Sequence, residues 1–203
     1  MLDIAQASAN QTNSIFNSSE FKYNSFKGVQ NWEAVLKKSS SEFKEFLACA
    51  NNKQKCQTPE QHTWREFTLS IRNLSRNQKI KAVNSYFNKW DYKSDQGIYG
   101  TQDYWASLSQ FMKNSGDCED YAIAKYYTLM ALGFKDHEMR IVALKDQNAE
   151  KGHVVLALYE REDIQILDNL SNSITSHHTL RNYTPLYSVN QTSRWVHKPK
   201  VLL

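Results

Sequence analysis

The sequence predicts an α+β fold, with a helical N-terminal half followed by a small antiparallel sheet. Apolar residues recur at helical spacing through the first half of the chain, whereas short β-branched runs separated by polar turns occupy the second half. Helices that precede strands along the chain are typical of α+β proteins. The chain has 203 residues, of which 40% are hydrophobic and 12% aromatic, and this suffices for one hydrophobic core.

The expected organisation is an N-terminal arm followed by one domain. Residues 1–30 are rich in Asn, Ser and Gln with spaced aromatic residues, and they predict a partly ordered arm whose aromatic side chains rest on the body. Residues 31–203 are expected to form a single domain. Its first part, 31–112, is mainly helical, and its second part, 113–203, holds one more helix and the antiparallel sheet.

The helical half begins with a helical pattern over residues 31–49. Thr58 and Pro59 are typical of the N-cap and first turn of the next helix. Two stripes at helical spacing are expected to be core, namely Trp64, Phe67, Ile71 and Leu74, and then Ile80, Val83, Phe87 and Trp90.

The remaining elements follow from glycines and β-branched runs. A loop over 91–100 interrupts the helical pattern, and a short helix is expected over 104–112. The next helix extends from about Cys118 to Leu132 and stops at Gly133. Strands are expected in three runs, at 139–144, 153–159 and 164–170.

Charge and hydropathy argue against two kinds of interaction, with nucleic acid and with the membrane interior. The formal net charge is +4, but the basic residues are scattered among acidic ones, which favours a mixed solvated surface over a nucleic-acid interface. No apolar run approaches the roughly 18 to 20 residues of a membrane span, so no membrane insertion is expected. The first residues lack the basic start and apolar centre of a signal peptide, which fits either a cytosolic protein or a mature chain without its export signal.

The three cysteines divide into a possible pair and a single residue. Cys49 and Cys56 lie seven positions apart, a spacing that a loop can close into a disulfide, and Cys118 is left over. An unpaired cysteine beside such a pair suggests a reactive thiol in an exported protein. The alternative is three reduced, unrelated cysteines in the cytosol.

Cys118 stands at the expected start of a helix, in the stretch N-S-G-D-C-E-D-Y-A-I. The neighbouring carboxylates of Asp117, Glu119 and Asp120 raise the pKa of a thiol and weaken it as a nucleophile. The unpaired N–H groups of a helix start have the opposite effect, because they favour a thiolate and can also bind an oxyanion. Cys118 is therefore either an inert thiol or a nucleophile whose acidic surroundings are neutralised.

His153 and Asp168 are the candidate base and orienting group for Cys118. If Tyr159 and Ile164 flank a four-residue loop, the pairing register places Asp168 opposite Val155, on the sheet face of His153. Diagonal neighbours on one face lie about 7 to 8 Å apart, so the Asp168 carboxylate can reach the imidazole. Each residue alone is more often structural, and the hypothesis depends on three separate elements bringing them together.

The acidic residues around Cys118 suggest a cation site. Asp117 and Glu119, with Asp120 and the upstream Asp103, offer hard oxygen ligands that suit Ca²⁺, although the spacing is not that of an EF-hand. The alternative is that Asp117 only caps the helix and that Glu119 and Asp120 only complement its dipole.

The motifs G-D-C-E-D-Y-A-I-A-K-Y, G-H-V-V-L-A-L and I-L-D-N-L resemble those of the bacterial transglutaminase-like cysteine peptidases of the LapG type. The resemblance covers roughly residues 104–195. It implies a papain-like or transglutaminase-like peptidase fold with a catalytic triad of Cys118, His153 and Asp168. It also implies Ca²⁺ binding by the acidic residues that flank the cysteine.

The resemblance further implies a biological setting. Proteases of this type cut the N-terminal region of a large surface adhesin and thereby release a biofilm. An inner-membrane receptor that senses cyclic di-GMP holds them through its periplasmic domain, so a periplasmic location is expected. Two other functions stay open for such a fold: a transglutaminase-type acyl transferase, and a non-catalytic regulatory binding domain.

Overall fold

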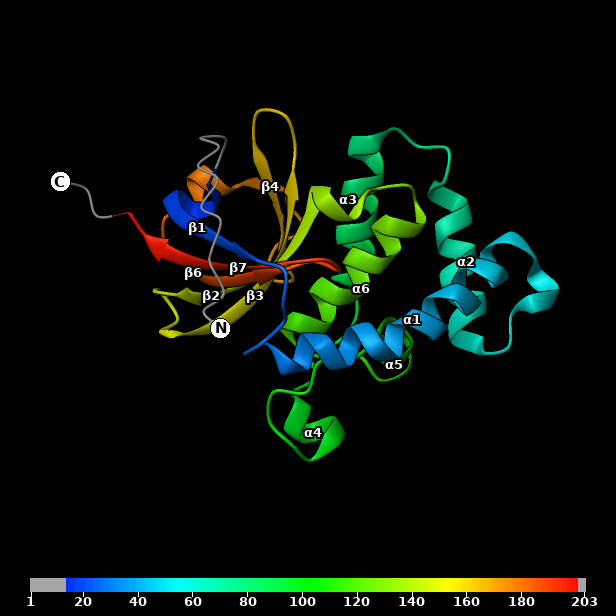
Figure 1. Cartoon of the computed structure of the whole chain (residues 1–203). Coiled ribbons are helices and arrows are strands. Elements are labelled where there is room, and N and C mark those ends of the chain that lie inside the picture. The colour runs from blue at the N-terminus through cyan, green and yellow to red at the C-terminus, as the bar shows by residue number, and fades with distance from the viewer. Residues whose placement is uncertain (1–13, 201–203) are drawn as a thin grey trace.

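The computed structural model describes residues 14–200 and has one layer of helices packed against one sheet (Figure 1). The helices are α1 Gln30–Asn51, α2 Pro59–Ile71, α3 Arg76–Phe87, α4 Asp95–Tyr99, α5 Leu108–Asn114 and α6 Cys118–Ala131. The strands are β1 Ser18–Tyr23, β2 Met139–Asp146, β3 Lys151–Tyr159, β4 Ile164–Leu167, β5 Thr175–Ser176, β6 Tyr183–Val189 and β7 Arg194–Pro199. Short 3-10 helices are η1 Ile15–Asn17, η2 Lys53–Lys55, η3 Asp136–Glu138 and η4 His177–Thr179.

The sheet has seven strands in the order β1-β7-β6-β2-β3-β4-β5, and neighbouring strands are antiparallel. The α+β class and the antiparallel pairing of the three predicted runs are thus confirmed, while β1, β5, β6 and β7 are additional strands. Tyr159 pairs with Ile164 across the β3–β4 turn, and this is the register that the sequence predicted.

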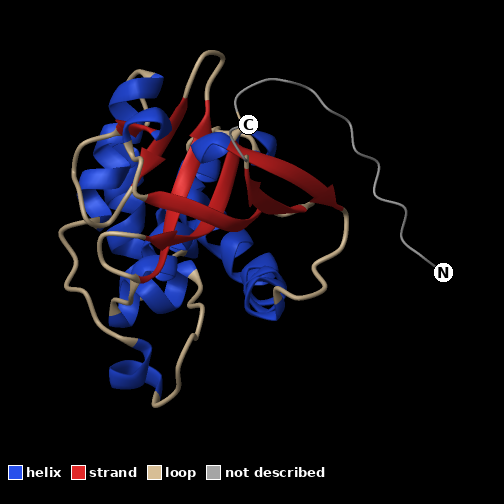
Figure 2. Cartoon of the chain, turned by 90° about the vertical axis from the view of Figure 1, so that its left-hand side faces the viewer, coloured by secondary structure: helices blue, strands red, loops and turns tan. Residues whose placement is uncertain are grey.

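The α-helices lie on one face of the sheet (Figure 2). Helix α6 packs against β3 and β2. The main core fills the space between these layers and contains most of both predicted stripes, since Trp64, Val83 and Phe87 are fully buried. Leu74 is the exception, because it lies beyond the end of α2 and is 37% exposed. A smaller apolar cluster covers the opposite face of the sheet, where η1 packs against η4 and β6.

The helix expected over 104–112 begins only at Leu108, because hydrogen bonds to other helices hold the preceding residues outside the helix. The backbone N–H of Ala106 donates to Asp120 of α6, and that of Tyr104 donates to Asp95 of α4. Ser107 then caps the helix through a capping box. The sequence also missed α4, a five-residue helix inside the predicted loop 91–100.

Part of the predicted N-terminal arm belongs to the sheet. Residues 1–13 lie outside the described part of the chain, whereas β1 pairs with β7 along its whole length, from Ser18 opposite Pro199 to Tyr23 opposite Arg194. Phe16 packs against the smaller apolar cluster and Phe26 against the main core.

Cys49 and Cys56 form a disulfide with a Cα–Cα distance of 4.5 Å, and Cys118 is a free cysteine. The bridge ties the end of α1 to the loop before α2. In residues 14–200, the structure contains no helix with both the length and the apolar character that crossing a membrane requires.

Candidate active site

Cys118 is the first residue of α6, and Asp120, two residues further along the helix, holds the chain that precedes the cysteine. One oxygen of the buried Asp120 carboxylate accepts from the Asp117 backbone N–H at 3.2 Å, and the other accepts from Ala106 N–H at 2.6 Å. Asp120 therefore joins the start of α6 to the segment before α5. This anchoring role explains why the third residue of the helix, Asp120, is acidic.

Gly116 gives the Asp120 carboxylate its space. A Cβ atom at Gly116 would lie 2.2 Å from Asp120 Oδ2 and 2.6 Å from Asp120 Cβ, far inside van der Waals contact. The turn before the cysteine therefore requires glycine, because any side chain at position 116 would displace the Asp120 carboxylate that anchors the helix start.

The Cys118 thiol lies between helix α6 and strand β3. It donates to Glu119 Oε2 at 3.1 Å, and the backbone N–H of Val154 on β3 acts to lower the pKa of the thiol. Burial raises the pKa of this thiol, and the carboxylates of Glu119 and Asp117 raise it further. The thiol thus lies next to the backbone that follows His153, and it is protonated in this arrangement.

His153 and Asp168 form a buried pair. His153 Nε2 lies 2.9 Å from Asp168 Oδ1, and the two residues are 5% and 6% exposed. Because a carboxylate accepts from Nε2–H, the neutral imidazole carries its lone pair on Nδ1. Within residues 14–200 no hydrogen bond joins Cys118 to His153, since the thiol donates to Glu119 instead.

Tyr183 of β6 is a site residue that the sequence analysis missed. Its hydroxyl donates to Asp168 Oδ2 at 2.7 Å, and the Leu170 backbone N–H donates to Oδ1 at 2.9 Å. Burial alone would raise the pKa of Asp168, but the hydrogen bonds from His153, Leu170 and Tyr183 and the charge of His153 together lower it. Asp168 is therefore ionised and held by donors at both oxygens.

An acidic cluster adjoins the start of α6. Oxygen atoms of Asp95, Asp117 and Asp120 lie within 4.8 Å of one another, and ligand atoms of Asp117, Cys118 and Glu119 form an overlapping group. Burial and mutual repulsion raise the pKa of Asp117 and of Asp120 to about 8, and the pKa values of Asp95 and Glu119 are also raised. The cluster thus gathers carboxyl groups that resist ionisation together, and within residues 14–200 no basic side chain forms an ion pair with any of them.

The structure places Asp103, the fourth expected ligand, outside both groups of ligand atoms. Its Oδ2 accepts from the Asn31 side chain at 2.8 Å, and its Oδ1 accepts from the Trp105 indole at 3.0 Å. Asp95 takes a place in the cluster instead. The sequence offered a weak signal for Asp95, since it follows Ser94 at a short helix start, but only the tertiary structure brings α4 to α6.

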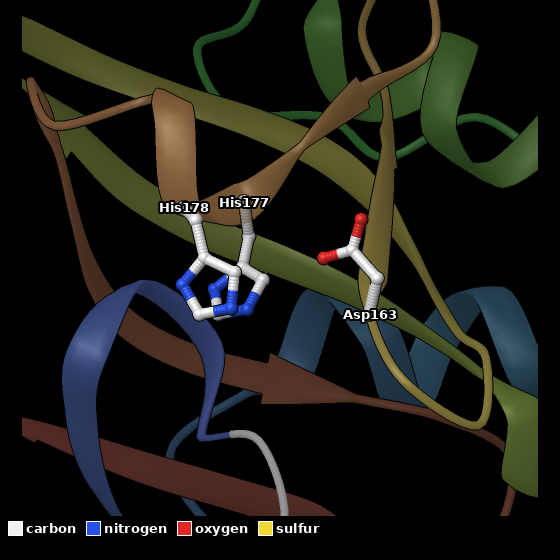
Figure 3. A group of neighbouring side chains, drawn as sticks. All are labelled: Asp163, His177 and His178. Atoms are coloured by element: carbon white, nitrogen blue, oxygen red, sulfur yellow. The ribbon is translucent and has the colours of Figure 1, made fainter.

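Asp163, His177 and His178 form a separate group of potential ligands on the smaller-cluster side of the sheet (Figure 3). His177 is 3% exposed, and its Nδ1 accepts from the backbone N–H of Phe16 at 3.0 Å. The neutral ring therefore carries its proton on Nε2, which is buried without a hydrogen-bond partner among residues 14–200 and in this tautomer has no lone pair for a metal. Since metal-bound histidines usually donate through their second nitrogen, the arrangement does not fit a metal centre.

A family model described as bacterial transglutaminase-like cysteine proteinase (BTLCP) matches residues 35–200, which include every residue of the Cys118 site. The chain belongs to this family. Comparison with curated proteins gives no match.

Solved structures support membership of the cysteine proteinase family. Legionella pneumophila LapG is 30% identical over 76% of this chain and 87% of that chain, with a TM-score of 0.64. The calcium-bound form of that protein gives the same values, and its EGTA-treated form covers 84% of that chain with the same identity and TM-score. The chain is therefore a LapG-like cysteine peptidase with a transglutaminase-like fold.

The acidic cluster of this proteinase has the chemistry of a calcium site. Asp95 Oδ1 and Asp117 Oδ1 are both buried and have no hydrogen-bond partner among residues 14–200. Hard carboxylate oxygens that are close together and lack donors are the ligands that Ca²⁺ prefers. A cation would offset the burial and the mutual repulsion that raise the pKa values of these acids.

Proposed function

We propose that the protein is a calcium-dependent cysteine endopeptidase with Cys118 as nucleophile, His153 as general base and Asp168 as orienting group. The hydrogen bond of 2.9 Å between His153 and Asp168 supports this proposal most directly. It joins His153 on β3 to Asp168, the residue that follows β4, and β3 packs against α6, the helix that Cys118 begins.

In the proposed mechanism, Asp168 holds Nε2–H, and Nδ1 of His153 takes the proton of the Cys118 thiol. The thiolate attacks the scissile carbonyl, and the backbone N–H of Cys118 at the first position of α6 helps to bind the oxyanion. His153 then protonates the leaving amine. Water hydrolyses the thioester with His153 again acting as base, and Cys118 is regenerated.

Asp117, Asp120 and Asp95 would hold Ca²⁺ through carboxylate oxygens, with Glu119 beside them. The bound ion would supply positive charge that neutralises the acids next to the thiol. Asp120 contributes in addition by anchoring the helix start, and Glu119 by its hydrogen bond with the thiol. Each of these carboxylates therefore affects the position or the acidity of Cys118.

The proposal extends to substrate, partner and location. The substrate is the N-terminal region of a large surface adhesin, cleaved in the periplasm to release a biofilm, and an inner-membrane cyclic di-GMP receptor holds the enzyme through its periplasmic domain. The resemblance to LapG-type proteases supports all three. The Cys49–Cys56 disulfide supports the location, because disulfides persist in oxidising compartments.

The test is incubation of the protein with the N-terminal segment of a large adhesin from the same organism, with Ca²⁺ or with EGTA. We expect cleavage only with Ca²⁺ and only when Cys118 is present, so the matched control is Cys118→Ala. Cleavage by Cys118→Ala would refute the assigned nucleophile, and equal cleavage in EGTA would refute the calcium dependence. Incorporation of a labelled amine without hydrolysis would favour the transglutaminase activity.

A further inference from the structure

A surface hollow adjoins the turn that leads into Cys118. Its volume is about 490 Å³, within the roughly 300 to 1,000 Å³ of typical ligand pockets. The segment after α3 meets the end of α5 and the following turn here. The wall includes Lys89, Trp90, Asp91, Lys93, Lys113 and Ser115.

The hollow carries positive charge. The side chains of Lys89, Lys93 and Lys113 are exposed, and within residues 14–200 none of the three forms an ion pair. Among the described residues of the wall Asp91 is the single acid, and no carboxylate of the proposed calcium site lines the hollow. Three unpaired ammonium groups against one carboxylate attract an anionic ligand.

Backbone and side-chain hydrogen bonds hold the hollow in place relative to Cys118. The Lys93 N–H donates to the Gly116 carbonyl oxygen at 2.9 Å. The Ser115 hydroxyl donates to the Asp91 carbonyl oxygen. The segment that carries two of the lysines is thus tied to the turn directly before the nucleophile.

The Trp90 ring gives the hollow a firm apolar wall. The ring packs against Phe111 of the main core, with 5.6 Å between the centroids. The Trp90 carbonyl oxygen accepts from the Tyr121 hydroxyl of α6 at 2.5 Å. The lysine side chains can therefore adapt to a ligand while the wall behind them stays fixed.

The hollow is within reach of a substrate bound at the thiol. Ser115 is three positions before Cys118, and an extended chain spans at most about 3.6 Å per residue, so their Cα atoms lie within roughly 11 Å. A substrate strand over the thiol advances about 3.3 Å per residue. A side chain about two to four residues from the scissile bond therefore reaches the hollow.

Exposed apolar side chains adjoin the triad on two segments. Among the large apolar residues exposed in the described chain are Tyr92 and Leu170, at 59% and 62% exposure. Tyr92 pairs with Gly116 in a parallel bridge, and the Leu170 N–H donates to Asp168. Both offer apolar contact to a polypeptide that crosses the site, and Tyr92 stands between two residues of the hollow.

We propose that this hollow is a specificity subsite that binds an acidic side chain of the substrate, about two to four residues from the scissile bond. The inference rests on the proposed function, because it takes Cys118 as the nucleophile and a polypeptide as the substrate. Lys89, Lys93 and Lys113 bind the carboxylate and take no part in bond cleavage.

The expected preference is moderate, because each exposed ion pair contributes little free energy. Three lysines around one carboxylate should favour an acidic residue over its amide about five- to tenfold in kcat/KM. The contact exists both before and during bond cleavage, so the preference should appear in KM and not in kcat. Added salt should reduce it, since exposed charges are screened.

The experiment profiles the cleavage sites of the enzyme with Ca²⁺ in a chymotryptic digest of a bacterial proteome, whose peptides keep internal acidic and basic residues. Mass spectrometry identifies the cuts. We expect the wild-type enzyme to select Asp or Glu at a position near the cut. A synthetic peptide with Asp at that position, compared with its Asn counterpart, then gives kcat and KM separately.

Charge reversal at the hollow should invert the selection. The variant that combines Lys89→Glu, Lys93→Glu and Lys113→Glu should select Lys or Arg, and glutamine at the same positions should abolish the preference. The glutamine variant decides the matter if the reversed one does not fold.

The matched control makes the same charge change on α1 and η2, outside the hollow, by Lys44→Glu, Lys53→Glu and Lys55→Glu. We expect this control to keep the wild-type preference. Cleavage without selection of acidic residues overturns the subsite and leaves the peptidase function standing, and so does a preference that the hollow variants keep.

Binding to the Cys118→Ala protein separates the subsite from the proposed function. Fluorescence anisotropy compares two labelled decapeptides in which alanine alternates with glutamate or with glutamine. We expect the glutamate peptide to bind about five- to tenfold more tightly, and the lysine substitutions in the hollow to remove this difference. If the wild-type enzyme cleaves no peptide but the difference holds, the proposed function fails and the hollow remains a site for acidic peptides. Equal binding of the two peptides overturns the subsite whether or not the enzyme cleaves.

Discussion

Removal of the Tyr183 hydroxyl tests whether its hydrogen bond to Asp168 supports the proposed catalytic triad. In Tyr183→Phe the ring remains between His153 and Phe16, but Asp168 Oδ2 loses its donor at 2.7 Å. A hydrogen bond to a charged group contributes about 1.5–3 kcal/mol, and here the carboxylate left behind is buried. If this free energy is lost in the transition state, kcat falls roughly 10- to 100-fold.

The same substitution changes the pH dependence of stability. The pKa of Asp168 is lowered in the folded protein, so its contribution to stability is present above the unfolded-state pKa and is lost as pH falls through the folded-state pKa. Tyr183→Phe removes one of the hydrogen bonds that lower this pKa. We therefore expect a loss of stability at neutral pH that becomes smaller as the pH falls below about 4.

The assay is kcat and KM on a cleaved peptide together with urea denaturation at pH 7 and pH 3. Tyr159→Phe is the matched control, because the Tyr159 hydroxyl is buried without a partner in the described part of the chain. We expect the control to retain activity and stability. A Tyr183→Phe enzyme with unchanged kcat would show that the hydroxyl does not support the Asp168 carboxylate in catalysis.

Three further predictions concern the helix start, the acidic cluster and the disulfide. Gly116→Ala forces a methyl group against Asp120 and should lower the free energy of unfolding, measured by denaturation, by on the order of 1–3 kcal/mol. It should also weaken calcium binding, measured by calorimetry. The control Gly97→Ala should have a small effect, because its Cβ meets only Ser94 Oγ, at 3.5 Å. Because the pKa of Asp117 and that of Asp120 are raised to about 8, the calcium-free protein should lose thermal stability as pH rises from about 4 to 8, and saturating Ca²⁺ should abolish this fall in a melting series. Reduction of the disulfide, which closes a loop over a separation of seven residues, should cost roughly 2 kcal/mol in urea denaturation without changing kcat.

The parts of the site that local signals determine could be predicted from sequence. The helix start at Cys118 follows from a glycine turn and helix-forming residues. The approach of Asp168 to His153 follows from the length of one hairpin turn, because the register of an antiparallel pair is fixed by its connection. Both inferences use contacts between residues that are close in sequence or lie on adjacent strands.

Tyr183 and Asp95 could not be found in this way. Strand β6 contains Pro185, and proline in a central strand normally argues against a strand because it cannot donate to the ladder. The structure accommodates it at an irregularity, where Ala143 pairs with Tyr187 but Leu144 pairs with Pro185. Asp95 reaches the cluster because α4 folds back to α6, and no periodic pattern reports such a contact.

The pairing of β1 with β7 has a practical consequence for any shortened form of the protein. A chain that starts at residue 31 would lack the strand that covers β7, and the uncovered backbone groups would form a template for strands of other molecules. Such a form is expected to self-associate even with every residue of the active site present. An affinity tag or fusion partner therefore belongs before residue 14, where it leaves this strand intact.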